Sequence, residues 1–174
     1  MSQFTNPLVV SPMNDGKFWV IREAFQYDLG SEGSGNSIVV PVGFVTDFTS
    51  VPVGFRFLIP KWGRYGKAAV IHDWLYWDQP AGMFQEQADE IMLEAMQVLQ
   101  VSPLKEWFIH NAVKWFGHYA WEKNTFLKQQ GENRVLPEDK IEKSIGLSNT
   151  QIHKKKVGVR VYEYLKNMKQ QQNI

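Results

Sequence analysis

Residues 67–77 of the chain read KAAVIHDWLYW. Apart from the first lysine and a His-Asp pair, every position is apolar or aromatic, and a helix that is apolar on all sides is buried. Pro80 and Gly82 follow closely and are typical of a helix end. The stretch therefore predicts a buried helix. Its polar interruptions, His72 and Asp73, need an explanation, because charged side chains are rarely buried without a partner.

Two more helices are predicted downstream. Residues 84–99 carry apolar side chains at spacings of three and four, which is the pattern of one helix face. Residues 104–127 follow Ser102 and Pro103, a typical cap and first helical residue. Gly117 is expected to bend this third helix.

The part before these helices has a β pattern. Residues 17–29 are rich in Phe, Trp, Val and Tyr, residues 37–45 are β-branched, and the run GSEGSGN lies between them. Such a pattern predicts a β-hairpin whose loop, residues 30–36, is exposed, mobile and without a ligand. The fold class is therefore expected to be α+β, with an N-terminal β-hairpin or small antiparallel sheet followed by three to four helices.

A chain of 174 residues is within the range of one domain. We expect this domain to cover residues 1–128. The polar residues that follow predict a loop, and residues 157–168 predict an amphipathic helix. The sequence leaves a homo-oligomer open.

The composition excludes several classes of protein. The chain has no cysteine, so disulfides, thiolate metal sites and a cysteine nucleophile are excluded. A net charge of +1 gives no strong signal for nucleic acid. There is no apolar run of the roughly 18 residues that a membrane span needs, and the start lacks the pattern of a signal peptide. The expected location is therefore the cytoplasm.

Four polar residues in apolar or turn-forming segments are the candidate functional residues. They are Asp47, in the run TDFTSVP, His72 and Asp73 in the buried helix, and Asp89, which shares a helix side with methionines. One imidazole and three carboxylates suit Mg²⁺, Mn²⁺ or Ca²⁺, and Zn²⁺ less well. The same residues also suit a metal-free pair, in which an aspartate orients the histidine as a general base.

A purely structural interpretation stays open for each of the four. Asp47 would cap a turn, His72 would be a hydrogen-bonded core histidine, and Asp89 would be an ordinary face residue. Asp73 would pair with Arg64 or Lys67. His110 and His118 lie roughly on one helix face and are extra metal-ligand candidates or amphipathic fillers.

Four motifs follow one another along the chain, namely PVGFVTDFTSVP, GRYGKAAVIHDWLYW, QADEIMLEAM and HNAVKWFGHYAW. Together they resemble the DUF1353 family, a group of small phage and prophage proteins, over about residues 38–121. The resemblance implies that Asp47, His72, Asp73 and Asp89 are the residues that the family shares. The HD pair is also similar to that of secreted phospholipases A2, although the cysteines that frame those sites are absent.

The chain departs from the family pattern where an arginine is common, because Gln85 and Glu86 stand there. If that arginine binds an anionic substrate in relatives, this chain needs another cation. The candidates are Arg56, Lys61 and Arg64.

The residue types of the four candidates favour a hydrolase, and the resemblance implies that it is encoded by a phage and acts in the cytoplasm of the infected host cell. His72 and Asp73 would be catalytic, and Asp47, His72, Asp73 and Asp89 would be ligands of a divalent metal ion if one is bound. The residues expected to bind substrate are Tyr76, Trp77, Arg56 and Arg64, with Trp62 and Trp115 as further candidate walls of the pocket. A small molecule is the expected partner, either a host nucleotide immune signal, which would make the protein an anti-defence factor, or a cell-wall fragment. The alternatives are a binding protein that sequesters a small molecule and a virion or assembly component.

The crowding of acids also predicts how variants behave. Carboxylates that repel one another destabilise the fold, so removing one relieves the repulsion. We therefore expect Asp73→Asn and Asp89→Asn to leave the protein folded, with an equal or higher melting temperature.

Overall fold

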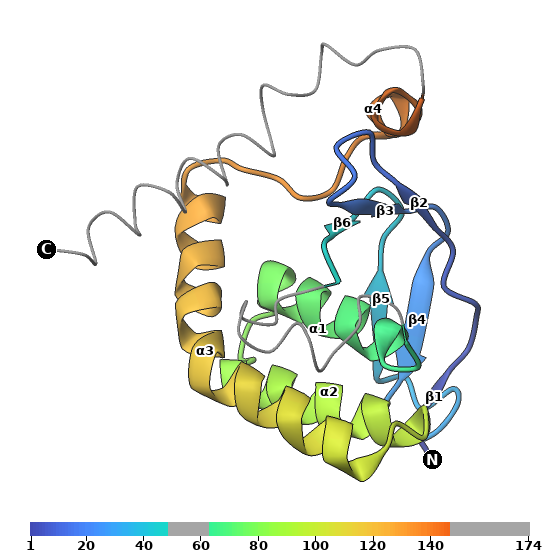
Figure 1. Cartoon of the computed structure of the whole chain (residues 1–174), viewed down its shortest axis with the longest axis vertical. Helices are drawn as coiled ribbons and strands as arrows, with labels where there is room; N and C mark the ends of the chain where they lie inside the picture. The colour runs from blue at the N-terminus through green and yellow to red at the C-terminus, as the bar shows by residue number, and fades with distance from the viewer. Residues whose placement is uncertain (49–62, 147–174) are drawn as a thin grey trace, which may run out of the picture.

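The computed structural model describes residues 1–48 and 63–146. Within them, short antiparallel strands at the N-terminus are followed by helices (Figure 1). The α+β class predicted from the sequence is confirmed. Arg56, Lys61, Trp62 and the predicted helix over residues 157–168 lie outside the described residues.

The strands form two three-stranded antiparallel sheets. The first has the order β1 (Gln3–Phe4), β4 (Phe25–Asp28), β5 (Ser37–Val40), and the second has the order β2 (Val10–Pro12), β3 (Trp19–Ile21), β6 (Val45–Thr46). In the first sheet Phe25 pairs with Val40 and Asp28 with Ser37, which confirms the predicted hairpin. Its loop is exposed, as expected.

Residues 17–29 form two strands rather than one. The break falls between β3 and β4. There the Asn6 side chain accepts a hydrogen bond from the backbone N–H of Gln26 and donates one to the backbone carbonyl of Ala24. β3 then pairs with β2 and β6, whereas β4 pairs with β1 and β5. The alternation of apolar and polar side chains along a strand does not reveal which strand it pairs with. The sequence therefore could not place β3 and β4 in different sheets.

The helices are α1 (Gly66–Asp78), α2 (Gln85–Val98), α3 (Pro103–Gln129) and α4 (Glu138–Ile145). The first three begin and end close to the predicted positions. Figure 1 shows that α3 bends as it passes α2 and α1, as Gly117 led us to expect. α4 was not predicted, because its eight residues are too few for a clear apolar period.

The core is centred on α1, which is buried along nearly its whole length as predicted. A second cluster, formed by Val20, Val45, Leu136 and Ile141, joins the second sheet to residues that follow α3. There the Val45 amide donates to the Arg134 carbonyl at 2.8 Å and the Leu136 amide donates to the Gly43 carbonyl at 2.9 Å. The connection from α3 to α4 therefore packs against the strands beside α1 (Figure 1).

None of the helices in residues 1–48 and 63–146 combines the length and the apolar character that crossing a bilayer requires.

Candidate functional site

His72 of α1 and Asp89 of α2 meet in the interior between their helices. His72 Nε2 lies 2.8 Å from Asp89 Oδ1, and both side chains are buried. Tyr76 Oη donates to the same oxygen at 2.7 Å, and Gln85 Nε2 donates to Asp89 Oδ2 at 3.3 Å. Asp89 is thus the common acceptor of a buried set of side chains, called here the Asp89 network.

Helix geometry explains how this network forms. His72 and Tyr76 are one turn apart on α1, and their ring centroids are 4.0 Å apart. Gln85 and Asp89 are likewise one turn apart on α2. Burial, followed by the hydrogen bond and the charge of Asp89, raises the pKa of Tyr76, so this phenol stays a donor at all working pH values.

α3 closes the network at Gly117. A Cβ atom at this position would lie 2.2 Å from Tyr76 Oη and 2.7 Å from Gln85 Nε2. Real side chains do not approach this closely, so only glycine allows the helix to pass here. About two turns further along, Asn124 Nδ2 donates to the Tyr76 carbonyl at 2.9 Å and holds α3 against α1.

Asp73 lies next to the network but has different surroundings. Its carboxylate accepts a 2.5 Å hydrogen bond from Thr46 Oγ1, while the Phe48 amide donates to the same hydroxyl at 3.2 Å. Burial is the largest cause that raises the pKa of Asp73, and the nearby charge of Asp47 raises it further. Asp47 follows β6 directly and is half-buried. Asp47 and Asp73 are called here the acid pair.

Two cations that the sequence did not single out lie near the acid pair. The Arg134 guanidinium carbon is 5.8 Å from the ring centroids of both Phe44 and Trp77, and its charge offsets part of the rise in the Asp73 pKa. Lys123 of α3 is half-buried. Burial, and then repulsion by Arg134, lowers the pKa of Lys123 to about 8, against the opposing effect of Asp47.

The structure therefore arranges the four candidate residues as two adjoining groups. His72 and Asp89 form one, Asp47 and Asp73 the other, and His72 is near enough to act electrostatically on Asp73. Among residues 1–48 and 63–146 no three or more His, Asp or Glu side chains converge so as to hold a metal ion. Binding of a metal ion by the four candidate residues stays a prediction from their residue types.

The structural alternatives are also decided in part. Thr46 Oγ1 accepts a hydrogen bond from the Phe48 amide, and Asp89 is buried rather than an ordinary face residue. Asp73 does not pair with Arg64 or Lys67. The Lys67 ammonium donates instead to the Asn6 carbonyl at 3.3 Å.

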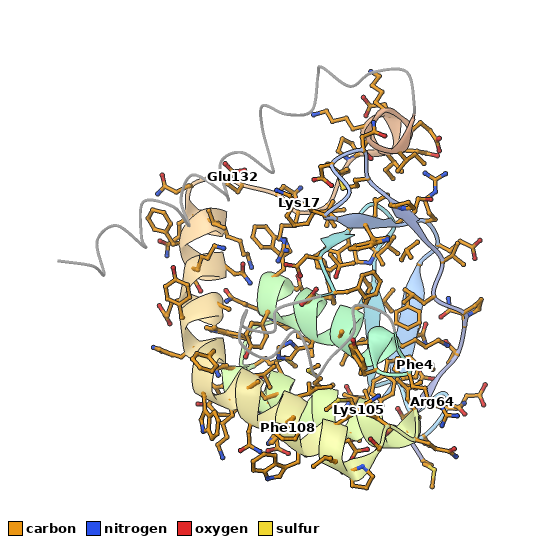
Figure 2. All side chains as sticks on the ribbon, viewed as in Figure 1. Phe4, Lys17, Arg64, Lys105, Phe108 and Glu132 are labelled. Carbon is orange, nitrogen blue, oxygen red and sulfur yellow. The ribbon has the colours of Figure 1, made fainter. Side chains whose placement is uncertain are left out.

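The remaining predicted residues lie in several places. Tyr76 belongs to the Asp89 network, and Trp77 is buried beside Arg134. Arg64 lies at the start of α1, at the opposite end of the molecule from Glu132 in Figure 2. There, with Lys67, it lines a cleft of about 430 Å³. Trp115 is 62% exposed on α3. His118 is exposed, and His110 Nε2 lies 3.8 Å from Glu90.

The acid pair gives a testable prediction about pH. Because the pKa of Asp73 is raised by folding, the folded chain holds this proton more tightly than the unfolded chain. The free energy of unfolding should therefore fall as the pH rises above the ordinary value of 3.8 toward the folded-state pKa. Asp73→Asn should be at least as stable as the wild type at pH 7, and the difference should vanish below about pH 4.

Urea unfolding of both proteins at a series of pH values measures this difference. Asp139→Asn, at an exposed position of α4, is the matched control and should follow the wild type. A variant less stable than the wild type at pH 7 would show that the ionised Asp73 stabilises the fold.

Comparison with known proteins adds one match. Residues 19–113, more than half of the chain, match the model of the family described as "Protein of unknown function (DUF1353)". All four candidate residues lie inside this range, whereas Lys123 and Arg134 lie beyond it. No curated protein and no solved structure matches the chain.

Proposed function

The chain belongs to the DUF1353 family, and we propose that it is a hydrolase in which His72 is the general base. The observation that carries this proposal is the 2.8 Å contact between His72 Nε2 and Asp89. With the Nε2 proton donated to the carboxylate, the neutral ring has its lone pair on Nδ1. Asp89 is itself held by Tyr76 and Gln85, so the ring orientation is fixed.

The acid pair would complete the reaction. His72 Nδ1 takes a proton from water as the hydroxyl attacks the substrate, and the bond to the leaving oxygen breaks. Asp73, whose raised pKa favours its protonated form, gives its proton to that oxygen. His72 then returns its proton through solvent, and Asp73 regains one. A general acid and a general base with different surroundings thus lie side by side on α1.

A divalent ion is not needed in this scheme. Mg²⁺, Mn²⁺, Ca²⁺ or Zn²⁺ remains a prediction from the residue types, but the described residues do not fit a metal, because no three ligands converge among them. We therefore derive no step through a metal.

The proposed substrate is a small molecule, either a host nucleotide signal or a cell-wall fragment. We also retain the proposal that the protein comes from a phage and acts in the cytoplasm of the infected cell. These proposals come from the resemblance to phage proteins.

Hydrolysis of a panel of nucleotides and cell-wall fragments by the purified protein, with and without EDTA, tests the proposed reaction. We expect turnover that EDTA leaves unchanged, and a loss of about 10²–10⁴-fold in His72→Gln, the usual contribution of a general base. Glu90→Gln, at an exposed position of α2, is the control. Turnover that persists in His72→Gln would remove His72 from the mechanism.

A second candidate is a binding protein without turnover, and the cleft at the start of α1 favours it. The cleft combines Arg64 and Lys67 with the apolar Leu8 and Leu99. Polar groups in an apolar cleft are what ligand binding requires. Binding of a panel compound without hydrolysis, weakened by Arg64→Gln, would support this function instead.

A further inference from the structure

We propose that Lys123 and Arg134 form an anion-binding subsite beside the acid pair, and that the substrate therefore carries a phosphate group. The second part rests on the proposed hydrolase, whereas the first part does not. No role was predicted for either cation from the sequence, and both lie beyond the residues that match the family.

The position of Arg134 is fixed by the fold. Its carbonyl accepts the 2.8 Å hydrogen bond from Val45, and the next residue, Val135, bridges to Phe44. Its guanidinium lies between the rings of Phe44 and Trp77, at 5.8 Å from each centroid. A cation held this way loses little conformational entropy when it binds an anion.

Lys123 lies on α3, whereas Arg134 lies in the connection that follows this helix. Its neighbour Asn124 donates to the Tyr76 carbonyl, and Lys128, one turn and more further on, donates to the Asp78 carbonyl at 2.7 Å. These contacts hold this part of α3 against the end of α1. Lys123 is therefore held half-buried, close enough to Arg134 for the two positive charges to repel each other.

Asp47 favours the charged form of Lys123 but does not form an ion pair with it. Among residues 1–48 and 63–146, neither Lys123 nor Arg134 forms an ion pair with any acid. Two neighbouring, partly buried cations without an ion-pair partner are destabilised, and a bound anion would recover that free energy.

Phosphate suits this arrangement better than an uncharged sugar. Its several oxygens accept hydrogen bonds from a planar guanidinium and from an ammonium at once. A phosphate group held there would place an adjoining ester bond beside Asp73, the proposed acid. Of the two substrate classes, the structure therefore favours the nucleotide over a neutral cell-wall saccharide.

Isothermal titration with inorganic phosphate, AMP and adenosine tests the subsite. We expect the wild type to bind phosphate and AMP, and adenosine at least tenfold more weakly than AMP. Lys123→Gln and Arg134→Gln should each weaken phosphate binding about tenfold or more, as expected for a charge-assisted hydrogen bond. Lys114→Gln, an exposed lysine on the same helix, should bind like the wild type.

His72→Gln separates this inference from the proposed reaction, because it should keep phosphate binding while losing turnover. If phosphate binds but no ester is hydrolysed, the subsite stands and only the hydrolase fails. Equal affinity for AMP and adenosine, or unchanged phosphate binding in both Lys123→Gln and Arg134→Gln, would overturn the inference. Lys123 is half-exposed, so its variant keeps the test valid even if Arg134→Gln does not fold.

Discussion

Asp89→Ala should lower the free energy of unfolding by about 3–5 kcal/mol, because each buried donor left without an acceptor costs about 1–3 kcal/mol. His72, Tyr76 and Gln85 all donate to this one carboxylate in a buried site. Without it, three buried donors lose their acceptor. We expect the general base to be lost as well, because nothing then orients the His72 ring.

Thermal and urea unfolding measure this loss, with Glu90→Ala as the control. Glu90 is the next residue of α2, but it is exposed and its contact with His110 is 3.8 Å long. Its removal should change stability by less than about 1 kcal/mol. If the two variants were equally stable, the Asp89 network would not contribute to the fold.

The network also revises the expectation for Asp89→Asn. The sequence suggested relief from repulsion, but Asp89 accepts hydrogen bonds and is not one of the acid pair. Asparagine keeps one acceptor oxygen and turns the other position into a donor, which then faces a donor. This variant should therefore be less stable than the wild type, with a loss smaller than that of Asp89→Ala. The expectation for Asp73→Asn is unchanged.

Gly117→Ala should be the second strongly destabilised variant, with a loss of about 1–3 kcal/mol from overpacking. Alanine is a better helix former than glycine, so in an open position this change would stabilise α3 by about 1 kcal/mol. Here the new methyl group would lie 2.2 Å from Tyr76 Oη. The helix must shift, or the hydroxyl must leave Asp89.

The double variant Gly117→Ala/Tyr76→Phe identifies the cause. Removing the hydroxyl makes room for the methyl group. The double variant should therefore lose less stability than the sum of the losses of the two single variants. Unfolding of the two single variants and the double variant gives this coupling. Lys114→Ala, an exposed change on the same helix, is the control and should be nearly neutral. Strict additivity would mean that the methyl group is accommodated without touching Tyr76.

The sequence predicted the helices well because their apolar periods are long and because proline and glycine separate them. It also singled out His72, Asp73 and Asp89 correctly as buried, since each interrupts an apolar pattern. Their grouping was not predictable, because the distance from α1 to α2 depends on how the helices pack. The two pairs therefore looked like one centre.

Lys123 and Arg134 were missed for a different reason. Both stand among polar residues, where a cation is unremarkable. Lys123 offered one signal, since it lies four residues before the buried Leu127 and hence on an inward side of α3. Arg134 offered none, because only the pairing of its backbone with Val45 brings it to the acid pair.

That backbone pairing bears on the order in which the molecule assembles. Val45 and Arg134 are far apart along the chain, and contacts between distant segments close large loops and form late. The α1–α2 contacts that hold His72 and Asp89 are local by comparison and can form first. During synthesis, Lys123 and Arg134 would thus reach the acid pair only after nearly all of the described chain has left the ribosome. In the nascent protein, the contact between His72 and Asp89 should therefore form well before the proposed anion-binding subsite.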